Sequence, residues 1–285
     1  MVQFDLWQPE TPVPLGFDQE DKLWVVTAVS GFSRFMAAWM VPTRAGHDVM
    51  AGMLQCFHQL GGVPRTVLWD GEGCIGQWRA GRQVLTENFQ RFRGALGMGV
   101  RLCKPRDPEA KGANERANGY YETSFLPGRR FVDVCDFNDQ LTTWLRRANR
   151  RVHANIHAVP QELVCEDRGA MHPLPPVLPD PSLRLSTRLP RDHYVRVETN
   201  DYSVNPRVVG RRVDVVMDLD QVVVTCAGVE VARHRRVLAK HRSILDPAHA
   251  MTLRMMRAEE TVRPAADTEV EVRDLADYDR ALGVA

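Results

Sequence analysis

The sequence has no long hydrophobic run. Its longest apolar stretch, residues 35–41, ends at Pro42, far short of the roughly 18 to 20 apolar residues that a membrane-spanning helix needs. The N-terminus also lacks the basic start and the apolar core of a signal peptide. We therefore expect no membrane association and a cytoplasmic location.

Paired cysteines and internal repeats are absent as well. The six cysteines are scattered, with no Cys-x-x-Cys pair, which argues against a disulfide framework and a zinc knuckle. His153 and His157 have helical spacing and Cys165 follows, but without a second cysteine we interpret these histidines as structural or solvated rather than as zinc ligands.

A strong net charge is missing too, since 37 Lys and Arg residues face 36 Asp and Glu residues. Total charge therefore does not indicate a nucleic-acid partner, but its distribution is uneven. Residues 186–242 carry eleven basic and seven acidic side chains, whereas residues 251–285 carry five and eight. A basic module is thus followed by an acidic tail.

The first half of the chain alternates strand-like and helix-like patterns. Strands are predicted at residues 4–7, 23–29, 35–41, 65–70 and 100–103, and helices at 45–60, from Thr86 to about 96, from Asp107-Pro108 to about 123, and at 137–149. Strands and helices that alternate in this way indicate a mixed α/β domain.

The second half has a different character. Six prolines lie between Pro173 and Pro190, and five valine-rich runs follow, at 194–197, 204–209, 213–217, 222–225 and 229–231. Such closely spaced short strands predict a small antiparallel β-barrel or sandwich. We therefore expect a core at 1–165, a Pro-rich linker at 166–190, a β-barrel module at 191–245 and a weakly helical acidic tail at 246–285.

Three carboxylates occupy positions that suit a metal site. Asp5 lies within the first strand, Asp70 ends a later strand, and Glu115 lies on the helix that starts at Asp107. If the strands are neighbours and the helix crosses their ends, the three side chains could hold two divalent cations for phosphoryl transfer. Lys111, one helical turn before Glu115, and Arg116 directly after it would suit an anionic polymer.

A chain of motifs resembles the IstA-type insertion-sequence transposases, which have a retroviral-integrase-like core. The matching segments are Phe4-Asp5-Leu6-Trp7, Gly31-Phe32-Ser33-Arg34, residues 62–65 running into 68–70, Lys104-Pro105 with residues 107–112 and Glu115-Arg116, and residues 125–129. The resemblance covers residues 2 to about 165 closely and the valine-rich module loosely.

That resemblance implies a ribonuclease-H-like mixed sheet with flanking helices, followed by the small antiparallel β-barrel. It implies that Asp5, Asp70 and Glu115 are catalytic ligands of Mg²⁺, with Mn²⁺ as a substitute. It also implies a DNA partner, a homo-multimer in a synaptic complex and an IstB-type ATPase helper. The candidate DNA contacts are Lys104, Arg106, Lys111, Arg116, Arg129 and Arg130.

Two other acids compete for the same roles. Glu72 lies near Asp70 but between glycines, and Glu122 lies seven residues after Glu115, nearly on the same helical face. We favour Asp70 because it follows its strand directly, and Glu115 because of its cationic neighbours. Glu122 adjoins Tyr120 and Tyr121, which suggests a packing role.

The sequence therefore predicts a metal-dependent DNA transposase that cleaves a 3′ end and transfers the strand. Family members carry N-terminal helix-turn-helix domains ahead of this core, whereas this chain begins four residues before Asp5. The alternative hypothesis is accordingly a catalytically silent, truncated regulator that binds DNA or forms multimers. A third hypothesis is a ribonuclease-H-like nuclease.

Overall fold

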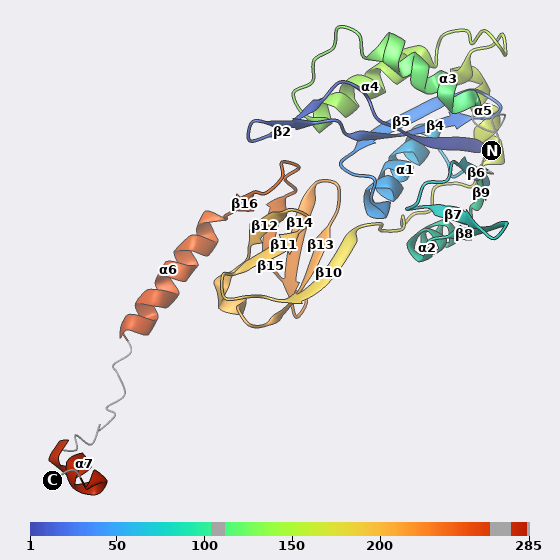
Figure 1. The fold of residues 1–285 in the computed structure, drawn as a ribbon. Coiled ribbons are helices and arrows are strands. Elements are labelled where there is room, and N and C mark those ends of the chain that lie inside the picture. Colours follow the sequence, from blue (N-terminus) through green and yellow to red (C-terminus); the bar gives the residue numbers. More distant parts are fainter. Residues whose placement is uncertain (104–111, 263–274, 284–285) are drawn as a thin grey trace.

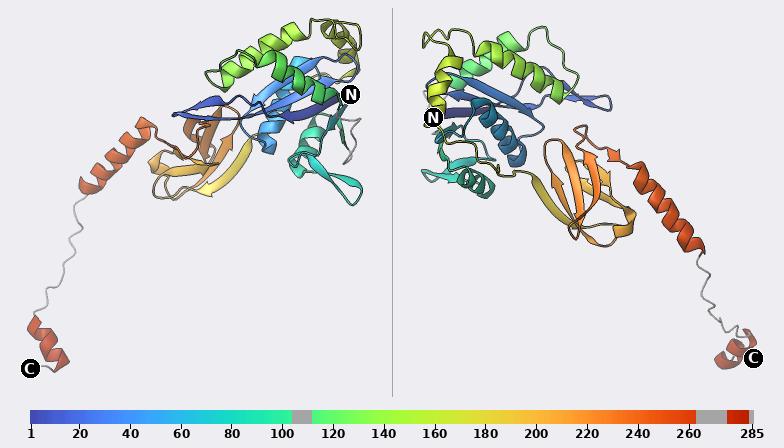
Figure 2. Two further views of the ribbon diagram at one scale, coloured as in Figure 1. Left: turned by 45° about the horizontal axis from the view of Figure 1, so that its top comes forward. Right: turned by 180° about the vertical axis from the view of Figure 1, so that it is seen from behind.

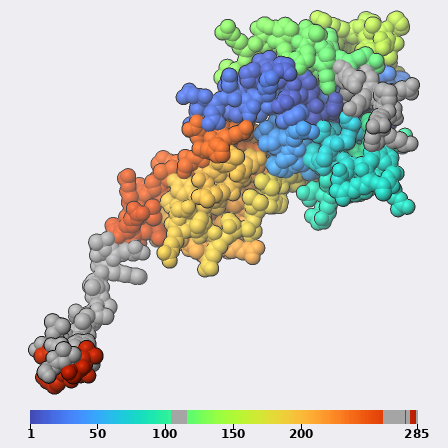
Figure 3. All heavy atoms as spheres, in the orientation of Figure 1, coloured from blue at the N-terminus to red at the C-terminus, as the bar shows by residue number. Residues whose placement is uncertain are grey.

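The computed structural model describes residues 1–103, 112–262 and 275–283. It consists of an α/β core, a β module packed below it, and a helix that extends from the module (Figures 1 and 3). Figure 2 shows the same arrangement from two further sides.

The core is built on a five-stranded mixed sheet, which confirms the predicted fold class. In spatial order its strands are β5 (Met36–Val41), β4 (Trp24–Ser30), β1 (Val2–Trp7), β6 (Thr66–Trp69) and β9 (Gly99–Leu102). The first three strands pair antiparallel, and β1–β6 and β6–β9 pair parallel. The β4–β5 hairpin turns at the predicted Gly31–Arg34 segment.

Helices cover both faces of this sheet. Helices α1 (Gly46–Leu60), α2 (Glu87–Ala95) and α5 (Pro160–Ala170) contribute to one hydrophobic cluster, and α3 (Gly112–Tyr120), the π-helical turn η1 (Tyr121–Phe125) and α4 (Val134–Ala148) contribute to the other. Helix α1 packs so closely that a Cβ at Gly52 would lie 2.7 Å from Val26 and Val41. A side chain at position 52 would therefore push the helix off the sheet.

Local capping explains the helix ends that the sequence predicted. Helix α1 stops at Gly61, whose φ of 82° is a left-handed C-cap conformation. Helix α2 begins after Thr86, whose hydroxyl accepts a hydrogen bond from the Phe89 backbone N–H. The predicted start of the next helix at Asp107-Pro108 lies outside the described residues.

Two hairpins and one helix were not predicted. The hairpin β2 (Val13–Gly16) with β3 (Gln19–Asp21) extends toward the β module, and β7 (Gly76–Arg79) with β8 (Arg82–Leu85) follows β6. Trp78 Nε1 of the second hairpin donates to the Cys103 carbonyl at 2.8 Å. Helix α5 packs on the core through the buried Val164.

The β module forms two sheets around one core. Strands β10 (Leu183–Arg188), β13 (Arg212–Met217), β14 (Gln221–Cys226) and β15 (Val229–Arg235) make an antiparallel sheet, and β11 (Tyr194–Val197), β12 (Asn200–Ser203) and β16 (Ser243–Ile244) make the other. Valines of both sheets share a single buried cluster.

The module differs from the sequence prediction at two places. Strand β10 pairs with β13 although its residues were expected in the linker. The expected strand at 204–209 is a 3₁₀ turn, η2 (Pro206–Val208), because Pro206 starts the turn and Asn205 caps it by accepting from the Arg207 N–H. The strand instead precedes it, at the more polar β12 segment.

The tail contains two helices, α6 (Pro247–Val262) and α7 (Leu275–Leu282). Helix α6 is held to the module at its start, where His249 Nδ1 and Ser203 Oγ lie 2.9 Å apart. It then extends away from the module (Figure 1). Within the described ranges, no helix combines the length and the apolarity needed to cross a membrane.

Core and module are joined by a buried ion pair. Arg236, which follows β15, donates to both carboxylate oxygens of Asp48 in α1 at 2.7 and 3.0 Å, and to Glu198 Oε1 at 3.0 Å. The side chains of Arg236 and Asp48 are 0% and 1% exposed. Lys240 and Asp21 form a second, exposed ion pair across the same interface at 2.8 Å.

Candidate active site

Asp5 lies in β1, and Asp70 directly follows the end of β6, the neighbouring parallel strand. The register of β1 and β6 pairs Phe4 with Trp69, and the two rings stack with centroids 5.5 Å apart in the cluster below the sheet. Because side chains alternate along a strand, Asp5 faces the side of the sheet opposite Phe4, and Asp70 directly follows Trp69 at the end of β6. Both aspartates are half-buried.

The Asp5 carboxylate is held in position by two donors. The Leu6 backbone N–H donates to Oδ1 at 3.0 Å, and Asn118 Nδ2 of α3 donates to Oδ2 at 3.0 Å. Thr27, the partner of Asp5 on β4, donates through its buried hydroxyl to the Asp5 carbonyl at 3.4 Å and lies 3.5 Å from Asn118 Oδ1. This shell fixes the carboxylate against α3.

Helix α3 crosses the sheet at β1 and β4. Glu115 belongs to this helix and lies three residues before Asn118, a spacing at which two residues share one face of a helix. Its side chain lies outside the described residues. Sequence reasoning missed Asn118, although its spacing from Glu115 was a usable signal.

The predicted DNA contacts are only partly described. Lys104, Arg106 and Lys111 lie outside the described residues. Arg116 is exposed on α3. Arg129 is bound internally, because its guanidinium donates to the Phe125 carbonyl at 2.6 Å and to Gln140 Oε1 at 3.0 Å, whereas Arg130 is exposed after η1, at the end of this helical segment away from Glu115.

Both competing acids have other partners. Glu72 accepts from Arg44 Nη2 at 2.7 Å and, through its backbone carbonyl, from the N–H groups of Ile75 and Gly76. Glu122 accepts from Trp7 Nε1 at 2.7 Å, in agreement with the predicted packing role. The carboxylates of Glu72 and Glu122 are therefore both held by side chains outside the candidate site.

The histidines near residue 155 form no metal cluster with Cys165. In the part of the chain that the structure describes, one group of side chains has ligand atoms within metal-binding distance of one another, namely His47, Asp48 and Glu198. Arg236 already neutralises both carboxylates of that group. We therefore interpret it as the ion pair between core and module.

Carboxylate oxygens are the possible metal ligands that Asp5 and Asp70 offer. Asp5 in β1 and Asp70 directly after β6 offer the hard oxygen ligands that Mg²⁺ and Mn²⁺ prefer. The hydrogen-bonded shell around Asp5 is typical of the outer contacts that orient such ligands. The donor set therefore fits a divalent-cation site.

Two segments of the chain match known protein families. Residues 3–108 match the family described as integrase core domain, and residues 174–246 match the family described as Mu transposase, C-terminal domain.

Two curated relatives are transposases. The putative transposase for insertion sequence element IS5376 of Geobacillus stearothermophilus is 25% identical over 264 residues, which cover 92% of this chain and 64% of that protein. The transposase for insertion sequence element IS21 of Pseudomonas aeruginosa is 26% identical over 215 residues, which cover 74% of this chain and 54% of that protein. The chain thus spans less than two thirds of the length of either relative.

Among solved structures, the catalytic core domain of BIV integrase aligns with a TM-score of 0.43 and 16% identity, covering 59% of this chain and 95% of that one. The HTLV-2 integrase catalytic core domain in complex with magnesium aligns with a TM-score of 0.42 and 15% identity, covering 56% of this chain and 93% of that one.

Proposed function

We propose that this chain, an integrase core domain followed by a Mu transposase C-terminal domain, is the DNA-cutting and DNA-joining part of an insertion-sequence transposase. The observation that supports the proposal is the register of β1 and β6, which pairs Phe4 with Trp69, the residues directly before Asp5 and Asp70. Glu115, on the helix whose Asn118 contacts Asp5, completes the set.

In this mechanism Asp5, Asp70 and Glu115 would hold two Mg²⁺ ions, for which Mn²⁺ could substitute. When bound, the ions would supply Lewis-acid activation of the attacking oxygen and would stabilise charge on the leaving oxygen. Asn118 and the Leu6 N–H keep the Asp5 carboxylate oriented throughout. Arg116 lies beside the site and contacts the phosphate backbone, together with Lys104, Arg106 and Lys111.

Two successive in-line displacements at phosphorus follow. In the first, water attacks a phosphodiester at the element end, the P–O3′ bond breaks and a 3′-hydroxyl is released. In the second, that hydroxyl attacks a phosphodiester of target DNA, so that one P–O bond forms as another breaks. No external energy source is needed, because the first step is the favourable hydrolysis of a phosphodiester to a phosphomonoester and a 3′-hydroxyl, and the second exchanges one phosphodiester bond for another.

The partners follow from the same proposal. Joining two DNA ends to a target requires at least two active sites, so the chain works as a homo-multimer on DNA, with an IstB-type ATPase as its helper. The basic surface of the β module would contact the DNA backbone. Light scattering with and without DNA would show whether DNA increases the molecular mass of the complex.

The test is Mn²⁺-dependent nicking and joining of labelled duplexes supplied with pre-nicked 3′ ends. The unchanged chain and the exposed-acid control Asp139→Asn are expected to be active, whereas Asp70→Asn and Glu115→Gln fall to background while remaining folded by circular dichroism. Full activity of either variant would remove that residue from the site.

Two outcomes would replace the proposal. If the unchanged chain neither nicks nor joins, and a variant without all three carboxylates still binds DNA independently of Mg²⁺, the chain is a regulator. If it cleaves RNA–DNA hybrids without joining, it is a nuclease.

A further inference from the structure

A basic pocket of about 370 Å³ lies next to the candidate active site, on the same face of the sheet. Its volume falls within the range of about 300 to 1,000 Å³ that is typical of small-ligand sites. The residues that line it include Val29, Met36, Ala117 and Tyr120 as an apolar floor, and Arg34, Arg116, Arg151 and His153 around the rim. Among the described lining residues there is no carboxylate.

The pocket and the aspartates share two elements. On β4, Val29 of the pocket floor lies two residues beyond Thr27, which contacts the Asp5 carbonyl, a step of about 7 Å along a strand. On α3, Arg116 and Ala117 of the pocket lie directly between Glu115 and Asn118. The pocket is therefore within reach of a strand held at the carboxylates.

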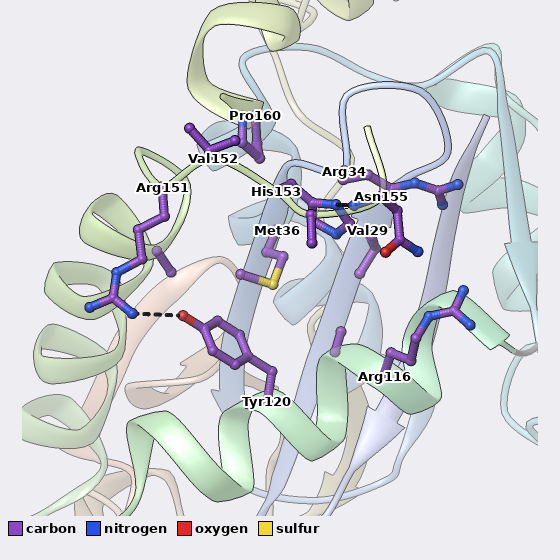
Figure 4. A pocket seen from close by; sticks show the side chains of 13 residues that line it. Val29, Arg34, Met36, Arg116, Tyr120, Arg151, Val152, His153, Asn155 and Pro160 are labelled. Carbon is purple, nitrogen blue, oxygen red and sulfur yellow. Dashed lines mark hydrogen bonds between the residues drawn. The ribbon is translucent and has the colours of Figure 1, made fainter. Parts of the chain in front are cut away.

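The cations are arranged on two sides of the floor. Figure 4 shows Arg34 and Arg116 on one side and Arg151 on the other, with Met36 between them. Arg151 Nη1 also donates to Tyr120 Oη at 3.3 Å, which orients its guanidinium over the floor. Burial, followed by the charges of Arg34 and Arg116, lowers the pKa of His153, in keeping with two arginines close to this imidazole.

The turn that carries Arg34 is fixed in an unusual conformation. Arg34 has a φ of 59°, which is uncommon for a residue with a side chain. Asp167 of α5 holds this turn by accepting from Ser30 Oγ at 2.6 Å and from the Ser33 N–H at 3.3 Å. The Gly31–Arg34 motif is thus built to present Arg34 at the pocket, a use that the carboxylate site does not explain.

We propose that the basic pocket is a nucleotide subsite, which holds one unpaired nucleotide of the DNA strand that lies across the carboxylates. Arg34 and Arg151 bind the phosphates on either side of that nucleotide, and its sugar or base covers the Met36 floor. Guanidinium groups suit phosphate oxygens, and an apolar surface accepts bases of any sequence. The identity of the strand rests on the proposed function.

The chemistry favours a nucleotide over an acidic peptide. Two cationic sides separated by an apolar floor match the alternation of phosphate, sugar and phosphate along a nucleic-acid strand. A peptide with adjacent carboxylates would leave that floor uncovered. The two ligands are therefore separable in a competition experiment.

The experiment measures binding of a fluorescein-labelled, 5′-phosphorylated tetrathymidylate to the full chain by anisotropy. The double variant Arg34→Asn with Arg151→Gln is expected to weaken binding about tenfold or more, because two charge-assisted contacts are lost. Asparagine is chosen at position 34 because it tolerates a positive φ. The control, Arg146→Gln with Arg147→Gln, removes two exposed arginines of α4 outside the pocket and should change binding less than about threefold.

A second pair of variants tests the pocket without removing a cation. Val152 lines the pocket and is 67% exposed, and Val177 is 83% exposed and lies outside it. Neither Val152→Asp nor Val177→Asp should disturb folding, yet only Val152→Asp should weaken binding of the oligonucleotide. Equal losses in pocket and control variants would overturn the proposal, since distributed charge would then explain the binding.

Competition and activity separate the remaining outcomes. If hexaglutamate displaces the label more strongly than unlabelled tetrathymidylate does, the pocket is a protein-docking site and the proposal is wrong.

Asp70→Asn should keep full oligonucleotide affinity while it loses nicking. If the unchanged chain shows no nicking but the pocket variants still lose affinity selectively, the transposase proposal fails and the subsite stands.

Discussion

The Asp5 carboxylate shows how single residues prepare the candidate site. Both of its oxygens accept hydrogen bonds, from the Leu6 N–H and from Asn118, so its orientation is set before any cation binds. Such outer contacts typically change metal affinity or activity by about ten- to hundredfold when they are removed. Asn118 is accordingly a positioning residue.

For Asn118→Ala we expect the Mg²⁺ concentration at half-maximal nicking to rise about tenfold or more, because Asp5 becomes free to turn away. The free energy of unfolding should fall by only about 1 kcal/mol, the usual value of one hydrogen bond. A Mg²⁺ titration of nicking measures the first quantity and urea unfolding the second. Asn88→Ala, at an exposed position of α2, is the control, and an unchanged titration in Asn118→Ala would contradict the assignment.

His47 predicts a pH dependence of stability. Burial lowers its pKa, which the charge of Arg236 lowers further, although Asp48 and Glu198 act in the opposite direction. The unfolded chain therefore takes up a proton at a higher pH than the folded chain does. Stability is full above the ordinary histidine pKa of about 6.5 and is lost as pH falls below it.

Urea unfolding at pH 7.5 and 5.5 measures this loss. His47→Gln should reduce the difference between the two pH values without abolishing it, because the pKa values of His153, His193 and His249 are lowered as well. A difference as large as that of the unchanged chain would show that His47 is protonated equally in both states.

At the scale of elements, the helix ends and strands that depend on neighbouring residues in the sequence could be predicted. The left-handed Gly61 and the Thr86 cap mark helix ends in the sequence itself, and the apolar runs around Asp5 and before Asp70 predicted the strands β1 and β6. The hydrogen bond from Asn118 to Asp5 joins residues 113 positions apart, and no local pattern reports such a contact.

The elements that were missed depend on tertiary contacts. The polar strand β12 is held by its pairing with β11 and by Asn200, whose amide donates to the Val237 and Ala239 carbonyls. Helix α3 was predicted to run to about residue 123, but from Tyr121 it takes the π-helical form of η1. There the buried Tyr121 stacks on Trp7 with ring centroids 5.1 Å apart. Side-chain packing, rather than propensity, decides both elements.

The turn η1 allows a test that separates packing from catalysis. Glu122→Ala removes the acceptor of the buried Trp7 indole N–H, so the free energy of unfolding should fall by about 1 to 3 kcal/mol. Glu122→Gln keeps an acceptor oxygen and should cost less. Both variants should retain nicking when folded, in contrast to Glu115→Gln. Loss of nicking in folded Glu122→Gln would favour Glu122 as the third ligand.

At the scale of the whole molecule, the core and the β module are joined by charge rather than by a continuous hydrophobic core. Their fully buried apolar residues form separate clusters, and the partly buried Leu219 and Leu238 of the module pack against the clusters of the core. Asp48 of the core meets Arg236 of the module without exposure to solvent. A buried pair of this kind contributes little net stability against an apolar replacement, but it is costly to break on one side only. It therefore specifies one docking geometry.

Arg236→Met should lower the free energy of unfolding by about 3 to 5 kcal/mol, because it leaves Asp48 buried without a counter-charge. The double variant Asp48→Leu with Arg236→Met should recover part of that loss, since the remaining partner of Arg236, Glu198, is 31% exposed and is hydrated rather than buried. The exposed pair across the same interface supplies the control, and Lys240→Met should cost no more than about 1 kcal/mol. Urea unfolding of the four proteins gives the three differences. If Arg236→Met cost no more than Lys240→Met, the buried pair would be dispensable for docking, and the relative placement of core and module would have to depend on the β2–β3 hairpin contacts instead.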